Sequence, residues 1–234
     1  MRFKANFHMH TGEDPKDAIP YTFFDAVDRA SALGFRALAI TCHNKFVDRA
    51  DYRDYASARG VLMIPGIEST IERAHVVVLN PDNEIEQVRT FDALRGYKKT
   101  HPDAFVLAPH PYFPDSYVLG EKLEEHIDLF DAIERSWFYT KHIDFNRRAE
   151  RAARTHKLPY LATSDTHDLR FIDAGYALVD AEELTVSAVL RALRAGNFEN
   201  RTAPRRLWRE LVPFFAGMSL RNFRKAHAAR RSSA

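Results

Sequence analysis

Five short apolar stretches of this chain each end at a histidine or an acid, and this feature constrains the fold most. The residues that follow these stretches are His8 with His10, His43, Glu68, His110, and Asp165 with His167. Short apolar runs are typical of buried strands, and the carboxyl ends of parallel strands meet on one face of a barrel. Histidine and carboxylate side chains are common metal ligands. The pattern therefore predicts one metal site on that face, and with it an enzyme.

Strand-like and helix-like segments alternate along the chain, which favours parallel strands covered on both faces. About seven such units predict an α/β fold, a small barrel. An open doubly wound sheet is the alternative, but His8-Met9-His10 follows the first strand where that fold has a glycine-rich phosphate loop. Strands are expected at 3–8, 36–41, 61–65, 67–71, 75–79, 104–108, 131–134, 159–163 and 175–179. Helices are expected at 22–33, 48–59, 118–129, 142–156 and 185–194, and another is marked by Ile85, Val88, Phe91 and Leu94 before Gly96.

Composition and the chain start place the protein in a reducing compartment. Cys42 is the single cysteine, so an intrachain disulfide is excluded. There is no run of 18 apolar residues, and Met1–Lys4 leads into a strand without the apolar region of a signal peptide. The cytoplasm is therefore the expected location.

Two His-Pro pairs test the rule that the site residues directly follow strands, which we call the strand-end rule. His101 precedes the strand expected at 104–108, whereas His110 follows it. The rule predicts that His110 reaches the metal site and that His101 is a solvated loop residue. His8 and His10 are two residues apart, so their side chains point to the same side of a strand.

The ordered motifs resemble the PHP domain, the polymerase and histidinol phosphatase family. They are His8-Met-His10-Thr, Ala39-Ile-Thr-Cys-His43-Asn, Pro65-Gly-Ile-Glu68, His75 before an apolar strand, His110-Pro and Ser164-Asp165-Thr-His167. The match runs from residue 3 to about residue 180. The resemblance implies a distorted (β/α)7 barrel that holds two or three divalent metal ions (zinc, manganese or iron) and hydrolyses phosphate esters.

The resemblance also implies a ligand set. Its members are His8, His10, Asp17, His43, Glu68, His75, His110, Asp165 and His167. Glu68 is expected to bridge two ions. His75 starts a strand, so it reaches the site only if residues 67–79 form a returning antiparallel pair with Glu72-Arg73-Ala74 as the turn.

The chain departs from the family pattern in two places. Cys42 stands where the family usually has aspartate; we interpret it as a buried thiol, with a soft metal ligand as the alternative. In the first loop, the literal offset of the family's acidic ligand falls on Pro15. Asp17 fits if the loop is slightly longer, and Asp14 is the rival.

The predicted function is a metal-dependent phosphoesterase that hydrolyses mono- or diesters of a small molecule or nucleotide by a metal-bound hydroxide. Arg135 and Arg170 are candidates for binding the substrate phosphate, or else surface arginines in ion pairs. Tyr112 and Phe113 indicate either a flat or apolar substrate group or simple packing. Two alternative functions remain: amide or lactone hydrolysis on the same barrel, and a non-catalytic metal-binding module.

The basic charge of the chain is concentrated at its C-terminal end. Residues 205–234 carry eight lysines and arginines against Glu210, whereas the whole chain has a net charge of +2. We therefore divide the chain into a barrel domain, 1–204, and a basic, aromatic-rich segment, 205–234, in which Pro213 should break or kink a helix. This segment either packs on the barrel or contacts a partner or an acidic membrane surface peripherally. The expected partner of the barrel is a small phosphorylated substrate, since no specific nucleic-acid motif is present.

Overall fold

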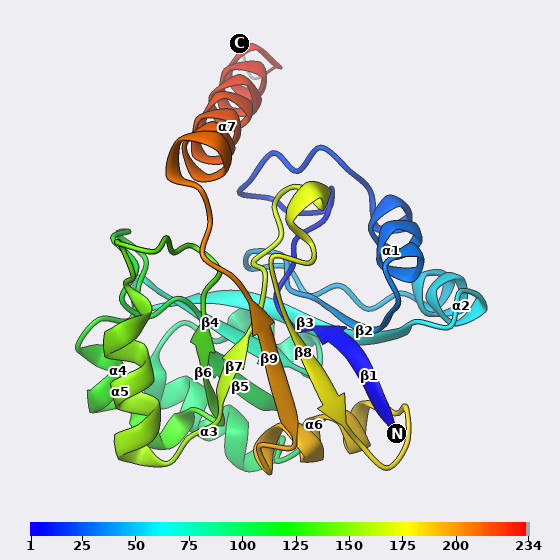
Figure 1. The fold of residues 1–234 in the computed structure, drawn as a ribbon, viewed down its shortest axis with the longest axis vertical. Helices are drawn as coiled ribbons and strands as arrows, with labels where there is room; N and C mark the ends of the chain where they lie inside the picture. Colours follow the sequence, from blue (N-terminus) through cyan, green and yellow to red (C-terminus); the bar gives the residue numbers. More distant parts are fainter. Residues whose placement is uncertain (233–234) are drawn as a thin grey trace.

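A nine-stranded sheet that curls into a nearly closed barrel forms the centre of the computed structural model, which describes residues 1–232 (Figure 1). The strands are β1 (Arg2–Asn6), β2 (Phe35–Ile40), β3 (Leu62–Ile71), β4 (Ala74–Leu79), β5 (Phe105–Ala108), β6 (Ala132–Arg135), β7 (Tyr160–Ala162), β8 (Gly175–Asp180) and β9 (Phe198–Thr202). Their order is β7-β6-β5-β4-β3-β2-β1-β8-β9. The predicted α/β barrel is confirmed.

The barrel is less parallel than the alternation of segments predicts. Strands β1, β2 and β3 pair in parallel, as do β5, β6 and β7. Strand β4 is antiparallel to both of its neighbours, and β8 is antiparallel to β1 and β9. The expectation of a parallel strand at 175–179 is therefore wrong in direction, and β9 was not predicted.

Helices cover the outside of the barrel and one of its ends. They are α1 (Phe23–Ala32), α2 (Ala50–Ala58), α3 (Phe91–Thr100), α4 (Lys122–Glu125), α5 (Asn146–His156), α6 (Val186–Arg194) and α7 (Val212–Ser232), with short turns η1 (Asn83–Gln87), η2 (Ile127–Leu129), η3 (Leu169–Phe171) and η4 (Leu207–Leu211). Helices α1 and α2 pack over β2, and α3 to α5 pack on the opposite side. Helix α6 packs its apolar face against the side chains that fill the barrel interior. The other end is left for the functional site.

One predicted helix is divided in two. The spacing of Ile85, Val88, Phe91 and Leu94 predicts one amphipathic helix, but η1 covers the first part and α3 begins only at Phe91. The reason is local: the side chain of Thr90 accepts a hydrogen bond from the Ala93 amide and caps a new helix, which then runs through Gly96. The helix predicted at 118–129 is likewise shortened to α4 and η2.

The seam of the barrel lies between β7 and the β8–β9 hairpin. The Asn200 side chain accepts a hydrogen bond from the Ala162 amide and donates one to the Tyr160 carbonyl, each over 2.7 Å. A side-chain amide thus takes the place of a backbone partner for β7, whose edge would otherwise be unpaired. At the same seam the start of β8 lies close to the backbone that follows β7, because Gly175 faces the carbonyl oxygen of Thr163.

The returning pair required by His75 is present. Strands β3 and β4 are antiparallel, Thr70 lies opposite His75, and Glu72 and Arg73 turn the chain with φ of 45° and 67°. Side chains two residues apart on a strand share a face, as do directly opposed residues on paired strands. His75 therefore lies on the same face as Glu68.

The C-terminal segment continues from η4 into α7, which extends from the end of the barrel where β1 and β6 terminate (Figure 1). Pro213 is the second residue of α7, where its missing N–H group costs little, so it does not interrupt the helix. Leu211 and Phe214 pack with Trp137. The first part of the segment thus packs on the barrel, as one alternative predicted; the membrane contact is not supported. Among the described residues, no helix is both long and apolar enough to cross a membrane.

Candidate metal centre

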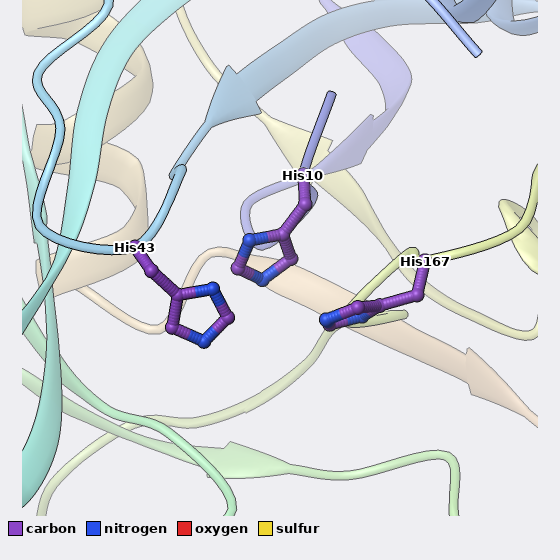
Figure 2. A group of neighbouring side chains, drawn as sticks. All are labelled: His10, His43 and His167. Carbon is purple, nitrogen blue, oxygen red and sulfur yellow. The ribbon is translucent and has the colours of Figure 1, made fainter. Parts of the chain in front are cut away.

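Side chains from the ends of separate strands converge at the open end of the barrel. His8 and His10 follow β1, His43 follows β2, His110 follows β5, and Asp165 and His167 follow β7; Glu68 and His75 lie within β3 and β4. Figure 2 shows the rings of His10, His43 and His167 facing a common space. The His10 ring centroid lies 4.4 Å from that of His43 and 4.2 Å from that of His167.

Glu68 lies at the centre of this cluster and is 1% exposed. Its Oε1 atom is 3.0 Å from His75 Nδ1 and 3.3 Å from His110 Nε2. Its Oε2 atom is 3.0 Å from His43 Nε2 and 3.4 Å from the Nε2 atoms of His8 and His10. Because the two oxygens face different imidazoles, Glu68 has the placement expected of a carboxylate shared by two metal ions.

Asp165 adds a second carboxylate. Its Oδ1 atom lies 3.2 Å from His10 Nε2 and 3.4 Å from both His8 Nε2 and His167 Nδ1. Asp165 and His110 have φ of 38° and 28°, a left-handed backbone that is strained in residues other than glycine. Strain of this kind is found most often at functional sites, where the surrounding structure maintains it.

The two acids of the first loop take different positions. Asp14 Oδ2 lies 2.8 Å from His10 Nδ1 and 2.9 Å from His43 Nδ1, behind both imidazoles. Asp17 Oδ2 lies 3.0 Å from His167 Nε2, and Asp17 lines the pocket described below. The arrangement gives Asp14 the contacts of a residue that orients imidazoles. The assignment of Asp17 as the loop ligand stays a prediction.

The donor set fits divalent metal ions. His8 Nδ1 lies 3.2 Å from Glu134 Oε2, while His8 Nε2 is buried and has no hydrogen-bond partner among the described residues. A buried nitrogen without a partner, directed at carboxylates, is the arrangement of a metal-binding imidazole. Ligand atoms lie within 4.8 Å of one another in the overlapping groups His10-His43-His167, His8-His10-Asp165, His8-Glu68-His110 and His43-Glu68-His75.

The electrostatics of the cluster keep the acids ionised. Burial alone would raise the pKa of Asp165 and of Glu68, but the surrounding histidines outweigh it and hold both values well below the usual range. Burial lowers the pKa of His43 to about 4, so its ring is neutral and offers a lone pair. For His10, hydrogen bonds to Asp14 and Asp165 outweigh burial and raise the pKa to about 10. A metal ion that binds His10 must therefore displace a proton from its ring.

Glu134 is a site residue that the sequence analysis missed. It is fully buried at the end of β6, its Oε2 atom accepts a hydrogen bond from the His110 amide, and its Oε1 atom accepts one from Thr163. Together with the contact to His8, these bonds give it an orienting role. Glu134 also ends a short apolar strand, so the strand-end rule could have identified it as a site residue.

The two arginines proposed for phosphate binding lie outside the pocket. Arg135 follows Glu134 on β6 and points to the other side of the strand, with its guanidinium 5.7 Å from the Tyr139 ring centroid. Arg170 is exposed and pairs with Asp168 at 2.7 Å. Neither arginine lines the pocket beside the cluster, and phosphate binding by these residues stays a prediction.

Cys42 is buried, and its Sγ atom lies 3.5 Å from Thr11 Oγ1. Burial raises the pKa of the thiol to about 11, which keeps it protonated at neutral pH. These observations agree with a packed thiol. The remaining histidines are outside the cluster; His101, for example, lies 3.0 Å from Asp82.

A pocket of about 250 Å³ opens beside the cluster. Its lining includes Asp17, Glu68, His75, His110 and His167 on one side. Among the described residues, Lys16 is the one lysine or arginine in the lining, and its Nζ atom lies 3.1 Å from His75 Nε2. Lys16 thus brings a positive charge to the pocket wall.

The metal-free protein should lose stability as the pH falls from 4 to 2, in part through Asp17. Burial would raise the pKa of Asp17, but the hydrogen bond to His167 and the nearby His43 outweigh it and lower the value from 3.8 to about 2. A carboxyl with a lowered folded-state pKa stabilises the protein above the unfolded-state value, and that contribution disappears as the pH falls through the folded-state value. The contribution is about 2 kcal/mol at pH 6 and about half of that at pH 3.

Urea unfolding of the metal-free wild type and of Asp17→Asn at pH 6 and pH 3 measures this contribution. The difference in free energy of unfolding should shrink by about half at pH 3. A difference of equal size at both pH values would contradict the interpretation. Glu84→Gln, at an exposed position in η1, serves as the control.

Comparisons with known proteins match one part of the sequence. Residues 144–198 match the family model described as PHP-associated. A DNA polymerase III PolC-type from Staphylococcus saprophyticus is 35% identical over 68 residues, which are 29% of this chain and 5% of that relative. The matched stretch is thus a small part of the polymerase.

Solved structures share the fold. One is a two-domain protein containing a predicted PHP-like metal-dependent phosphoesterase from Bacteroides vulgatus, with a TM-score of 0.68, 22% identity, and coverage of 86% of this chain and 65% of that one. Another is a lesion-specific endonuclease from Pyrococcus furiosus, with a TM-score of 0.64, 14% identity, and coverage of 88% and 60%. The chain spans less than two thirds of either protein.

Proposed function

We propose that the chain belongs to the PHP domain family and that it is a metal-dependent hydrolase that cleaves phosphate esters of small molecules. The observation that carries the proposal is the position of Glu68, whose two oxygens face separate sets of imidazoles beside an open pocket. The site lies on the barrel face where the active sites of such barrels are built.

The ligand positions divide around Glu68. His8, His10 and Asp165 would hold one ion with Glu68 Oε2, and His75 and His110 would hold a second beside Glu68 Oε1. Asp17 and His167 lie together at the edge of the cluster, where they would bind a third ion. Zinc, manganese and iron all suit this mixture of imidazoles and carboxylates.

The chain's own residues would divide the remaining tasks. Divalent ions bound here would supply Lewis acidity and a nucleophilic water at neutral pH. Glu134 holds the His8 ring, and Asp14 holds the rings of His10 and His43, so the imidazoles are oriented before substrate binds. The Lys16 ammonium lies at the pocket wall, where it would attract the phosphate group.

Amide or lactone hydrolysis is the second candidate. One observation favours it: the described pocket lining holds a single lysine and no arginine, whereas phosphate sites commonly use several cations. Turnover of a panel of phosphate esters, amides and lactones by the metal-loaded protein separates the two functions. Turnover of amides or lactones but not of esters would contradict the proposal.

His110→Ala should lose metal and activity, whereas His101→Ala should not. Both residues belong to His-Pro pairs, but His110 contacts Glu68 at 3.3 Å and His101 contacts Asp82 outside the cluster. We expect kcat/KM for His110→Ala to fall by at least about 100-fold, since even residues that only orient ligands account for 10–100-fold. Metal content by elemental analysis and kcat/KM for phosphate esters test both variants. Equal losses in the two variants, or none in either, would count against the site.

A further inference from the structure

The pocket beside the metal centre has an apolar side that hydrolysis itself does not explain. We propose that this side is a recognition site for a compact aromatic group of the substrate, and that α7 forms one of its walls. The proposal rests on the proposed function for the position of the phosphate, and it goes further by naming the substrate class: small phosphate esters of aromatic alcohols.

Three aromatic rings from separate parts of the chain build this side. Phe113 follows β5, Phe138 follows β6 and Phe215 belongs to α7; all three line the pocket. The Phe215 ring centroid lies 5.9 Å from that of Phe113, in a stacked arrangement, and 5.2 Å from that of Phe138. Met218, one turn further along α7, lines the same pocket. Aromatic rings and a thioether together favour contact with another aromatic ring.

Helix α7 is fixed to the loop that carries the acids. Asn222 donates a hydrogen bond to Asp17 Oδ1 over 2.6 Å and accepts one from the Ala18 amide over 2.7 Å. Lys225 Nζ donates to the carbonyls of Asp14 and Asp17, each over 2.8 Å. The wall is thus tied to the metal centre, and the position of α7 above the end of the barrel is visible in Figure 1.

The size and charge of the pocket define the ligand. A volume of about 250 Å³ lies below the range of about 300–1,000 Å³ typical of sites for drug-sized molecules. Lys16 is the one lysine or arginine among the described lining residues, and Asp115 adds a negative charge. The pocket therefore suits one phosphate group joined to one ring, and it does not suit a polyanion such as a nucleic-acid strand.

Benzyl phosphate and ethyl phosphate test the proposal, because both are esters of simple primary alcohols and differ mainly in the ring. With the full metal-loaded chain, kcat/KM for benzyl phosphate should exceed that for ethyl phosphate by about tenfold or more, as expected for burial of a ring. Phe215→Ala should reduce this ratio at least about fivefold, mainly through KM. Phe223→Ala, on the same helix but 68% exposed and outside this pocket, is the control with an unchanged ratio.

Binding measurements keep the proposal separate from the proposed function. Should neither ester be hydrolysed, calorimetry with benzylphosphonate and ethylphosphonate decides: tighter binding of the benzyl compound supports the recognition site while the phosphoesterase function fails. Met218→Ala replaces Phe215→Ala if the latter does not fold. Equal kcat/KM for the two esters, equal binding of the two phosphonates, or preferred cleavage of an abasic oligonucleotide would overturn the proposal.

Discussion

Glu68→Gln should abolish most metal binding and activity while leaving the barrel folded. Glutamine preserves the shape of the side chain but removes the negative charge that five imidazoles face: those of His8, His10, His43, His75 and His110. Its amide nitrogen cannot bind a cation, so at most one oxygen remains for two ions. We expect the metal content to fall by at least one ion per chain and kcat/KM to fall by more than about 100-fold.

Elemental analysis, kcat/KM for a phosphate ester and thermal unfolding of the metal-free proteins measure these effects. Glu199→Gln, an exposed acid paired with Arg2 on the rim of the sheet, is the control and should behave as wild type. Full metal content with full activity in Glu68→Gln would show that no ion depends on this carboxylate. Loss of metal with retained thermal stability would confirm that the effect lies in the site.

The strand-end rule predicts most of the cluster because it depends on topology alone. In the parallel parts of the barrel, residues that follow strands reach one face wherever the exact strand ends lie, so the rule separates His110 from His101 correctly. The prediction for His75 also required that β3 and β4 form a hairpin. The turn at Glu72 and Arg73 forms this hairpin.

Side-chain alternation explains why Arg135 lies outside the cluster and why Glu134 belongs to it. Consecutive residues on a strand point to opposite faces, so Glu134 and Arg135 cannot both reach the cluster of histidines and acids. Glu134 contacts His8, and Arg135 lies over Tyr139 instead. Applying this alternation to the short apolar run of β6 would have selected the acid.

The remaining parts of the site depend on contacts that no local pattern records. Asp14 and Asp17 lie three residues apart in one loop, and their roles follow from a turn in which Asp14 Oδ1 accepts hydrogen bonds from the Lys16 and Asp17 amides. Phe215 and Asn222 reach the pocket from α7, about 200 residues after that loop. The composition of residues 205–234 predicts a segment that packs on the barrel or contacts a partner, but not where that segment lies.

Gly175→Ala should destabilise the protein severely because it opens the seam of the barrel. A Cβ atom at position 175 would lie 2.3 Å from the carbonyl oxygen of Thr163 and 3.1 Å from its carbonyl carbon. Both are backbone atoms, which cannot move aside as a flexible side chain would. Overpacking usually costs about 1–3 kcal/mol, and we expect at least the upper end of that range.

The clash would also reach the site, since Thr163 donates to Glu134 and precedes Asp165 by two residues. Gly96→Ala is a matched control: a Cβ atom there would meet no heavy atom within 4 Å, and the residue lies inside α3. Removing a glycine from a helix interior should stabilise the protein by about 0.5–1 kcal/mol. Urea unfolding of both variants should therefore give changes of opposite sign, and a neutral Gly175→Ala would show that the seam is wider than the structure indicates.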